Sequence, residues 1–276
     1  MIIYQNEHIT VFQSALYQTT STVVLTKDLV LIVDPNWLPN EVDDIRNYVD
    51  SVKGDRELYL LFTHGDFDHI IGYKAFPGAK TIGSYALSCH PKKEYKISLI
   101  HEFDSKHYIN RNYPVEFPIL DIIISEDAEE LRIGDTLLTF YKSPGHTPDG
   151  LFTIIEPLGI WITGDYLSDF ELPFIYHSAK AYKETLKTAS QILNQHRIEL
   201  LVPGHGQVTT DTVEMKRRLD MSSDHLERLV KAVIAKDESA IAALGDEHAY
   251  KSSFTEECHE ENIRIIKQEY LFNLPG

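Results

Sequence analysis

The sequence predicts an α/β domain followed by a helical C-terminal segment. Over most of its 276 residues, short apolar runs typical of strands alternate with stretches of helical spacing. From Thr212 onward only helical spacing is found, and no repeat, low-complexity tract or glycine-rich linker interrupts the chain. We therefore predict one domain over residues 1–211 and a helical extension over residues 212–276 that packs on it.

The domain is predicted to begin with a β-hairpin, a helix and a buried strand. Residues 22–26 and 29–33 are apolar and flank two polar residues, a pattern typical of a hairpin. Asp34-Pro35 ends the second strand, because proline cannot continue a central ladder. Residues 41–52 carry apolar side chains at helical spacing, and residues 58–62 form an apolar run like those buried in sheets.

Four strands and one helix are predicted in the second half of the domain. The strands are expected at residues 137–141, 151–155, 160–163 and 200–202. A Glu-Pro-Leu-Gly turn joins the second of these strands to the third. Residues 179–196 have helical spacing and precede the last strand.

The C-terminal extension is predicted to contain two helices, at residues 212–236 and 255–271. The first carries an apolar stripe at helical spacing, and such a stripe usually packs against a neighbouring part of the protein. A homodimer interface is the alternative use of this face. The stripe consists of Leu219, Leu226, Leu229, Val230 and Val233.

Composition and charge restrict the partners and the compartment. The formal net charge is −16, which argues against nucleic acid and anionic membranes, because both are bound mainly through lysine and arginine. No segment approaches the roughly 20 apolar residues that span a bilayer, and the N-terminus lacks the pattern of a signal peptide. The two cysteines, Cys89 and Cys258, form no CxxC motif. We therefore expect a cytoplasmic protein without disulfides that acts on a small-molecule substrate.

The strongest chemical signal follows the predicted strand at residues 58–62. In the segment Thr-His-Gly-Asp-Phe-Asp-His, the residues His64, Asp66, Asp68 and His69 can all bind a metal. The end of a strand is where α/β sheets place their ligand sites. Imidazole and carboxylate side chains together suit zinc, iron or manganese. For this segment alone, a solvated acidic turn with two bystander histidines is the alternative interpretation.

Three further candidate ligands occur in the same local setting. His146 lies in Pro-Gly-His-Thr, Asp165 in Thr-Gly-Asp and His205 in Pro-Gly-His-Gly, and each follows a predicted strand. The adjacent glycine leaves backbone room for a metal at each position. Any one of them alone would be interpreted as an ordinary loop residue. Four separate segments with the same pattern predict one shared metal site.

Taken in order, these motifs resemble the pattern of the metallo-beta-lactamase superfamily, a His-x-His-x-Asp-His segment followed by Pro-Gly-His-Thr, Gly-Asp and Pro-Gly-His-Gly. The resemblance covers about residues 20–210. It implies a four-layer αββα sandwich with a dinuclear site at one edge of the two sheets, and it matches Asp34 to an aspartate that supports the site. The ligands it implies are His64, Asp66 and His146 for the first metal, Asp68, His69 and His205 for the second, and Asp165 as the bridge.

Asp66 departs from the family pattern, because most members have histidine at this position. A carboxylate is a harder, anionic ligand and favours iron or manganese more than imidazole does. The expected cofactor is therefore a pair of divalent metal ions, either zinc or, given Asp66, iron or manganese. The flavodiiron proteins and some phosphodiester-cleaving members of the superfamily also have a carboxylate here.

The chemistry implied by such a site is hydrolysis. Two adjacent cations lower the pKa of a shared water toward neutrality, so that hydroxide forms and attacks a carbonyl or phosphoryl centre. Asp68 is expected to act in catalysis by holding the proton of this nucleophile as well as binding metal. We predict a hydrolase of a small ester, thioester, lactone or phosphodiester. The alternatives are a diiron redox or oxygen-binding protein of the same fold and a ligand sensor without turnover.

Candidate substrate-binding residues are fewer and come from two segments. Residues 101–113 are polar and aromatic, and Tyr108 and Arg111 are candidates to hold an anionic group, with an exposed connecting loop as the alternative. Tyr176 and His177 follow the bridging aspartate and are candidates to line the pocket. Four other histidines have no ligand-like setting and are assigned no role: His90, His225, His248 and His259.

Overall fold

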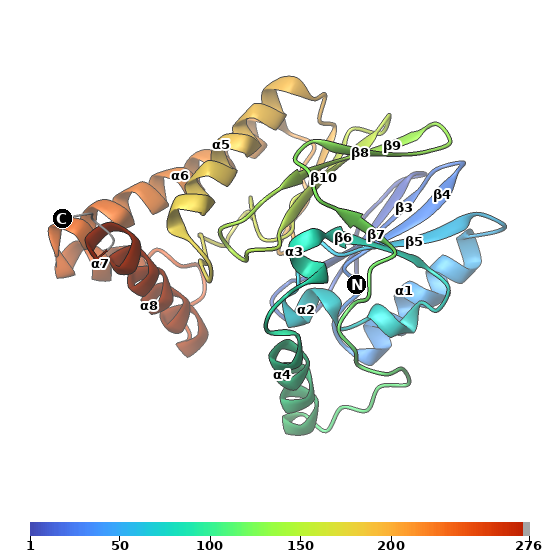
Figure 1. The fold of residues 1–276 in the computed structure, drawn as a ribbon, viewed down its shortest axis with the longest axis horizontal. Helices are drawn as coiled ribbons and strands as arrows, with labels where there is room; N and C mark the ends of the chain where they lie inside the picture. The colour runs from blue at the N-terminus through green and yellow to red at the C-terminus, as the bar shows by residue number, and fades with distance from the viewer. Residues whose placement is uncertain (273–276) are drawn as a thin grey trace.

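The computed structural model describes residues 1–272, which form two β-sheets packed face to face with helices on both outer sides (Figure 1). The predicted four-layer αββα sandwich with C-terminal helices is confirmed. In the first sheet the strand order is β1-β2-β3-β4-β5-β6-β7, antiparallel up to β4 and parallel from there on. Its strands are β1 (Ile2–Gln5), β2 (Ile9–Gln13), β3 (Thr20–Leu25), β4 (Leu29–Val33), β5 (Glu57–Leu61), β6 (Lys80–Ser84) and β7 (Ile122–Ile124).

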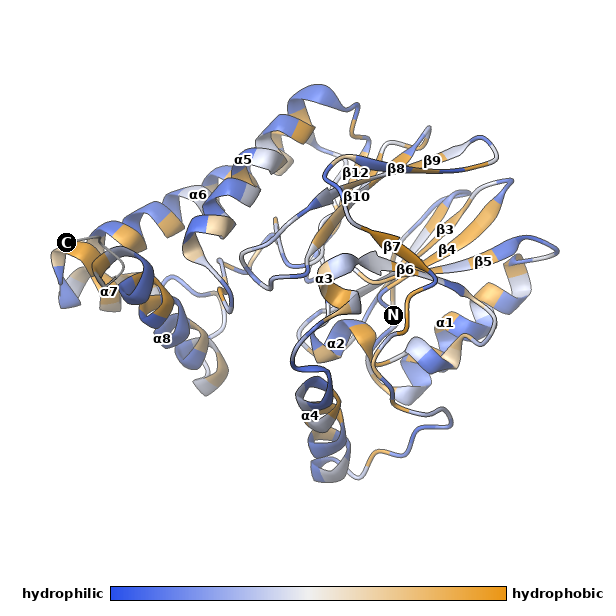
Figure 2. Ribbon diagram, viewed as in Figure 1, coloured by the Kyte–Doolittle hydropathy of each residue, from blue (hydrophilic) through white to orange (hydrophobic). Residues whose placement is uncertain are grey.

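The predicted hairpin is formed by β3 and β4, which pair antiparallel. Both strands are buried on both faces, because one face of the sheet packs on the second sheet and the other on helices. Figure 2 shows the apolar colour along these central strands. Since β4 and β5 are parallel, with Val33 opposite Leu61, Asp34 lies at the sheet edge where β5 also ends.

Helices cover the outer face of the first sheet. α1 buries Val42, Ile45 and Val49, as its helical spacing predicts. At its N-terminus, the carboxylate of Glu41 accepts a hydrogen bond from the backbone N–H of Leu38 at 2.9 Å. The helices on this face are α1 (Pro39–Val52), α2 (Phe67–Ile70), α3 (Tyr85–Ser88) and α4 (Lys93–Lys106), with a 3-10 turn at Tyr73–Ala75.

The second sheet contains all four strands predicted for this half of the domain. The strand order is β12-β11-β10-β9-β8, antiparallel except for the pair β11–β12. The Glu-Pro-Leu-Gly turn joins β10 to β11, as predicted. Strands β1, β2, β6, β7 and β8 are additional to the prediction. The strands of this sheet are β8 (Glu129–Ile133), β9 (Thr136–Lys142), β10 (Leu151–Glu156), β11 (Ile160–Ile162) and β12 (Leu200–Val202).

The space between the sheets is filled by apolar side chains from both. Leu31 of β4 and Val24 of β3 belong to one buried cluster with Phe140 of β9 and Ile155 of β10. Separate apolar clusters join each sheet to its helices on the outer side. This packing fixes the two sheets against each other. The loops that follow β5, β9, β11 and β12 therefore lie beside one another.

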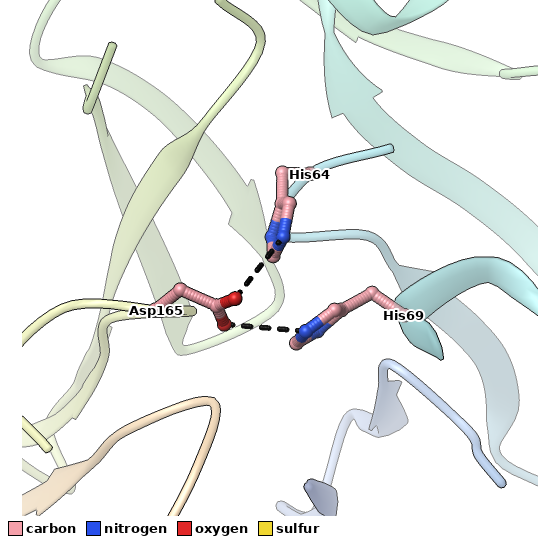
Figure 3. A group of neighbouring side chains, drawn as sticks. All are labelled: His64, His69 and Asp165. Atoms are coloured by element: carbon pink, nitrogen blue, oxygen red, sulfur yellow. Dashed lines mark ion pairs between the residues drawn. The ribbon is translucent and has the colours of Figure 1, made fainter. Parts of the chain in front are cut away.

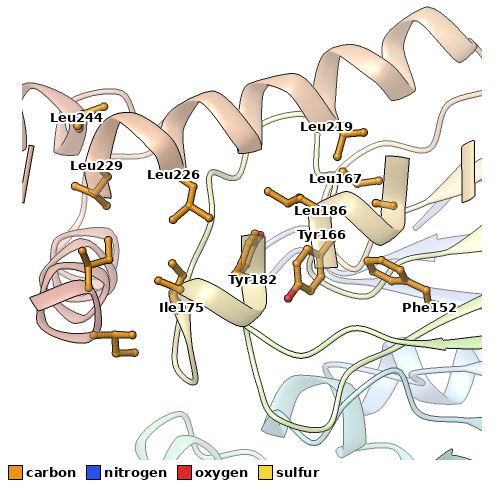
Figure 4. Close-up of a cluster of buried hydrophobic side chains, with 14 of the residues drawn as sticks. Phe152, Tyr166, Leu167, Ile175, Tyr182, Leu186, Leu219, Leu226, Leu229 and Leu244 are labelled. Atoms are coloured by element: carbon orange, nitrogen blue, oxygen red, sulfur yellow. The ribbon is translucent and has the colours of Figure 1, made fainter. Parts of the chain in front are cut away.

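The C-terminal extension packs on α5 (Ala179–Gln195) through the predicted stripe (Figure 4). Leu219, Leu226, Leu229 and Val233 are buried in one cluster with Leu186 of α5, and Val230 packs at its edge. A third helix, α7, lies between the two that were predicted. The helices of the extension are α6 (Thr212–Ala235), α7 (Glu238–Gly245) and α8 (Ser253–Lys267), followed by a π-helical turn at Gln268–Phe272.

Residues 101–113 are not a connecting loop throughout, because α4 continues to Lys106. This helix escaped prediction since its buried residues, Ile100 and Asp104, do not form an apolar stripe. Within residues 1–272, no helix combines the length and apolarity needed to cross a bilayer. Both cysteines are free; Cys89 is exposed and Cys258 is buried.

Candidate metal centre

The seven predicted ligands meet at one edge of the two sheets. The end of β5 leads into a turn and then into α2, and these carry the first four ligands. β9, β11 and β12 each lead into one of the other three. The side chains are at most 12% exposed, so the site is largely removed from water. The residues that the structure brings together are His64, Asp66, Asp68, His69, His146, Asp165 and His205.

Two of the histidines, His64 and His69, are oriented by hydrogen bonds that begin at Asp34. The Asp34 carboxylate accepts from the backbone N–H of Thr63 and from Nδ1–H of His69, both at 2.9 Å, and from the Thr63 hydroxyl. Because the Thr63 hydroxyl proton goes to Asp34, its oxygen accepts from Nδ1–H of His64 at 3.0 Å. Both imidazoles therefore turn Nε2 into the site. Asp34 thus has the supporting position that the family resemblance implied.

Backbone carbonyls orient the other two histidines, His146 and His205. Nδ1–H of His146 donates to the carbonyl of Phe174 at 2.7 Å, and Nδ1–H of His205 donates to that of Tyr17 at 2.9 Å. A metal-binding histidine commonly donates its second ring N–H in this way, which fixes its tautomer and orientation. All four histidines of the site therefore turn Nε2 toward the same space.

Asp165 lies between the two groups of ligands, as Figure 3 shows for His64 and His69. Its Oδ1 is 3.2 Å from Nε2 of His69, and its Oδ2 is between 3.2 and 3.5 Å from Nε2 of the other three histidines. Gly204 permits this approach, because a Cβ at that position would overlap Oδ1 of Asp165. The carboxylate is therefore placed as a bridging ligand would be.

The donor set fits two divalent cations. Within residues 1–272, several buried atoms that face the gap have no hydrogen-bond partner, namely Nε2 of His64, His69 and His146 and Oδ1 of Asp165. Buried polar atoms are normally partnered, so these lone pairs suit bound metal. The candidate ligands form two groups, and within each group the ligand atoms all lie within 4.8 Å of one another. They are His64, Asp66 and His146 on one side and Asp68, His69 and His205 on the other.

The carboxylates make the site strongly attractive to positive charge. Burial opposes protonation of His146, but the nearby carboxylates of Asp165 and Asp66 outweigh it and raise its pKa to about 10. Burial is likewise outweighed at His205, where the charges of Glu171 and Asp165 raise the pKa to about 10. Protons thus occupy the metal-free site at neutral pH. Metal binding must therefore release protons and weaken as the pH falls.

Asp66 has a second partner that the sequence did not indicate, Lys96 of α4. Oδ2 of Asp66 lies 3.4 Å from Nε2 of His146, whereas Oδ1 forms an ion pair with Nζ of Lys96. Burial opposes ionisation of Asp66, but Lys96 and the nearby histidines hold its pKa well below the usual range. The carboxylate is therefore charged, with one oxygen fixed by Lys96 and the other directed at the candidate metal ligands.

A cavity of about 490 Å³ opens above the ligands. Tyr176, which was predicted to line the pocket, lies on its wall, with its ring 5.3 Å from that of His146 and its hydroxyl 3.0 Å from Sγ of Cys258. A small molecule can therefore reach the ligands from solvent. α4 contributes Lys92, Tyr95, Lys96 and Leu99 to the wall, and α8 contributes Phe254, Glu257 and Glu261.

The other three residues predicted to contact substrate lie away from this cavity. The guanidinium of Arg111 forms a two-point ion pair with Asp104 and donates to the backbone carbonyl of Trp37 at 2.8 Å. Arg111 is occupied because the buried carboxylate of Asp104 requires a counter-charge. Tyr108 is 93% exposed beyond the end of α4, and His177 is also exposed. These three residues therefore do not line the cavity above the metal ligands.

Glu171 and Tyr17 are further residues of the site that no motif indicated. Burial raises the pKa of Glu171 to about 7, and its carboxylate lies 3.9 Å from Nδ1 of His205. Tyr17 supplies the carbonyl that orients the same histidine. Both residues lie in irregular segments, so only the folded arrangement reveals their nearness to His205.

Comparison with known proteins agrees with the observed fold. The sequence matches the model of the metallo-beta-lactamase superfamily over residues 15–205, whereas no curated protein matches it. The sec-alkylsulfatase Pisa1 from Pseudomonas sp. has a TM-score of 0.72 at 11% identity, and the match covers 99% of this chain and 50% of the sulfatase. A motif mutant of a metallo-beta-lactamase from Cronobacter sakazakii has a TM-score of 0.61 at 16% identity, with 86% of this chain and 99% of the other covered. ETHE1 from Myxococcus xanthus has a TM-score of 0.55 at 17% identity, and the match covers 97% of this chain and 92% of ETHE1. This chain thus spans half the length of the alkylsulfatase and shares its fold.

Proposed function

The chain belongs to the metallo-beta-lactamase superfamily, and from this premise we propose that it is a dinuclear metal-dependent hydrolase of a small ester, thioester, lactone or phosphodiester. One observation supports the proposal most directly: the unpartnered Nε2 and carboxylate atoms lie beneath a cavity that is open to solvent. Structural metal sites are closed by their protein ligands, whereas hydrolytic sites keep a position open for water and substrate. The open cavity therefore favours catalysis.

The proposed roles follow from where each side chain lies. Bound divalent cations would supply a hydroxide at neutral pH and polarise the substrate oxygen. Oδ2 of Asp68 is 3.6 Å from Nε2 of both His69 and His205, and Asp68 also faces the cavity. This position supports the proposal that Asp68 holds a proton of the attacking water as well as binding metal. The proposed ligands are His64, Asp66 and His146 for one cation, Asp68, His69 and His205 for the other, and Asp165 between them.

The test begins with elemental analysis of the protein purified without added metal. The protein is then loaded with the metal found and assayed against esters, thioesters, lactones, phosphodiesters and, because a sec-alkylsulfatase shares the fold, sulfate esters. We expect two metal ions per chain and hydrolysis of one class that a chelator abolishes and the metal restores. Asp165→Ala should remove both metal and activity, whereas Asp135→Ala, a surface aspartate paired with Lys27, should change neither. A fully loaded protein that is inert toward the whole panel would refute the proposal.

Asp66 favours one second candidate, a diiron redox or oxygen-binding protein. Three of the seven candidate ligands are carboxylates, and such sites suit iron better than all-histidine sites do. The same elemental analysis separates the two proposals. Stoichiometric iron with an oxygen-sensitive absorption band and no hydrolysis would support the diiron protein, whereas a colourless zinc protein would exclude it.

A further inference from the structure

A second cavity of about 330 Å³ adjoins the one above the metal ligands. Tyr17, Glu171, Phe174 and Phe254 line both, so a molecule that lies over the ligands can extend from one into the other. We call it the aromatic cavity. Its walls come from three separate parts of the chain, residues 15–18 before β3, residues 170–174 after Asp165, and residues 248–255 of the C-terminal extension.

The walls of the aromatic cavity consist of rings that pack on one another. The ring centroids of Tyr17 and Phe254 are 5.2 Å apart, and those of Phe174 and Phe254 are 5.9 Å apart. Phe174 also stacks on His248 at 5.5 Å. These are the distances at which aromatic pairs attract each other, so the rings hold one another in place. The cavity is therefore formed before any ligand arrives.

The charges around the aromatic cavity disfavour an anionic ligand group. Among the residues that line it there is no lysine or arginine, and Glu171 is the one carboxylate. The lysines Lys92 and Lys96 lie on a different wall, over the metal ligands. Phe254 remains 39% exposed and Tyr17 46% exposed although both line a concave surface. Exposed apolar rings around a preformed cavity are typical of a binding site for an apolar group.

We propose that the aromatic cavity binds an uncharged alkyl or aryl group of the substrate while the bond to be cleaved lies over the metal ligands. The inference rests on the proposed function and narrows it to hydrolysis of esters or thioesters with a hydrophobic organic group. A substrate with only a small or charged group would leave the aromatic cavity filled with water. It would therefore gain no binding energy from these rings.

The first test is an acyl-length series on the metal-loaded protein. Methyl esters that differ only in their acyl chain, from acetyl to decanoyl, are compared by kcat/KM. Because each methylene that leaves water favours binding, we expect kcat/KM to rise about threefold per methylene until the cavity is full. A value that stays constant or falls along the series would overturn the inference while leaving the proposed hydrolase intact.

Two exposed aromatic residues provide a matched pair of variants. Phe254 lines both cavities, whereas Tyr95 lines only the one over the ligands and is 55% exposed. Phe254→Ala should lower kcat/KM for the octanoyl ester about tenfold relative to the acetyl ester. Tyr95→Ala should leave this ratio unchanged. Equal ratios in both variants and the wild type would contradict the assignment of the cavity.

A binding measurement makes the inference testable even without turnover. Octanoate and acetate are titrated into the metal-loaded protein by calorimetry, and we expect octanoate to bind at least about tenfold more tightly. Phe254→Ala should remove most of this difference. A protein that is inert toward the whole substrate panel but binds octanoate selectively would refute the proposed hydrolase and retain the apolar site. Equal affinities for the two acids would refute the apolar site.

Discussion

Two groups of buried histidines occur in this protein, and only one of them faces buried carboxylates. In the candidate metal centre, the rings of His64 and His69 have centroids 4.1 Å apart, and those of His69 and His205 are 5.5 Å apart. We call the second group the C-terminal histidine group. In it, the ring centroid of His248 is 5.8 Å from that of His225 and 6.0 Å from that of His259. Ring packing is thus similar in both. The C-terminal histidine group consists of His225 on α6, His248 after α7 and His259 on α8.

The surroundings of the two groups give the same side chain opposite properties. Burial lowers the pKa of each histidine in the C-terminal group, and that of His248 to about 4. Within residues 1–272, these rings also have unpartnered nitrogens, yet their ligand atoms do not approach one another as those of a metal site do. In the metal centre, carboxylates reverse the effect of burial, as at His146. An unpartnered histidine nitrogen is therefore not enough for a cation site; the ligand atoms must converge, and in the metal centre buried carboxylates are directed at the same point as the histidines.

The comparison is tested most strongly by replacing one histidine in each group with alanine. His69→Ala should lower kcat/KM about 10³-fold or more, because several kcal/mol of transition-state stabilisation depend on the cation it holds. Its metal content should fall to one ion per chain or fewer. His259→Ala should keep the metal content and kcat/KM of the wild type, although it loses a hydrogen bond to the carbonyl of Ile241 at 3.0 Å. Elemental analysis and kinetics on folded protein measure both, and wild-type turnover by His69→Ala would contradict the assignment.

A smaller effect is expected at Asp34, which touches no metal in the proposed site but orients His69. Asp34→Asn keeps the shape of the side chain and removes the charge that accepts the Nδ1–H of His69 at 2.9 Å. We expect metal affinity to fall about 10- to 100-fold with the fold retained. Competition with a chromophoric chelator measures the affinity, and Asp135→Asn on the surface serves as the control. Unchanged affinity in Asp34→Asn would show that the hydrogen bond does not position the ring.

The ligands could be predicted from sequence because each lies close to the end of an apolar strand. β12 ends at Val202, and His205 follows directly; the same holds for Asp165 after β11. Gly204 belongs to the recognisable motif for a physical reason, since any larger residue there would collide with Asp165. The α/β domain and the seven candidate ligands therefore follow from local patterns, whereas the sandwich and the division of the ligands between two metals come from the resemblance to the superfamily.

The residues that escaped prediction depend on contacts between distant segments. Lys96 meets Asp66 only because α2 packs against α4, and α4 itself has no apolar stripe. Arg111 looked like an anion-binding residue, because nothing in the local sequence shows that Asp104 is buried and needs its charge. The aromatic cavity likewise arises where three irregular segments meet, and α7 is too short to show a clear period. Tertiary pairing determines these features.

The C-terminal histidine group should make the protein sensitive to acid. The folded-state pKa of His248 is about 4, below its value of 6.5 in an unfolded chain, so the unfolded chain takes up the proton first as the pH falls. Stability is therefore lost between pH 6.5 and about 4. Wild type should lose about 1 to 2 kcal/mol more unfolding free energy than His248→Phe between pH 7 and pH 4.5.

This pH effect is measured by urea denaturation of metal-free protein, so that loss of metal in acid does not contribute. Phenylalanine keeps an aromatic ring beside Phe174 but cannot be protonated. The ionisable groups that face His248 are His225, His259 and Glu247, and they are the same in both proteins. An identical loss of stability in wild type and His248→Phe would show that His248 is not kept neutral by burial.

The smallest effect is expected at Glu247, a carboxylate that faces His225 and His248 of the C-terminal histidine group. Its carboxylate lies 3.2 Å from Nδ1 of His225 and 2.6 Å from the guanidinium of Arg228, and it is 37% exposed. Arg228 holds the pKa of Glu247 at about 2, so this charge is already neutralised and partly screened by water. Glu247→Gln should therefore cost only about 0.5 kcal/mol of unfolding free energy and leave metal content and kcat/KM unchanged. Should metal content fall in Glu247→Gln, a solvent-exposed carboxylate would suffice to make a cation site, and burial of the carboxylates would not be what separates the two groups.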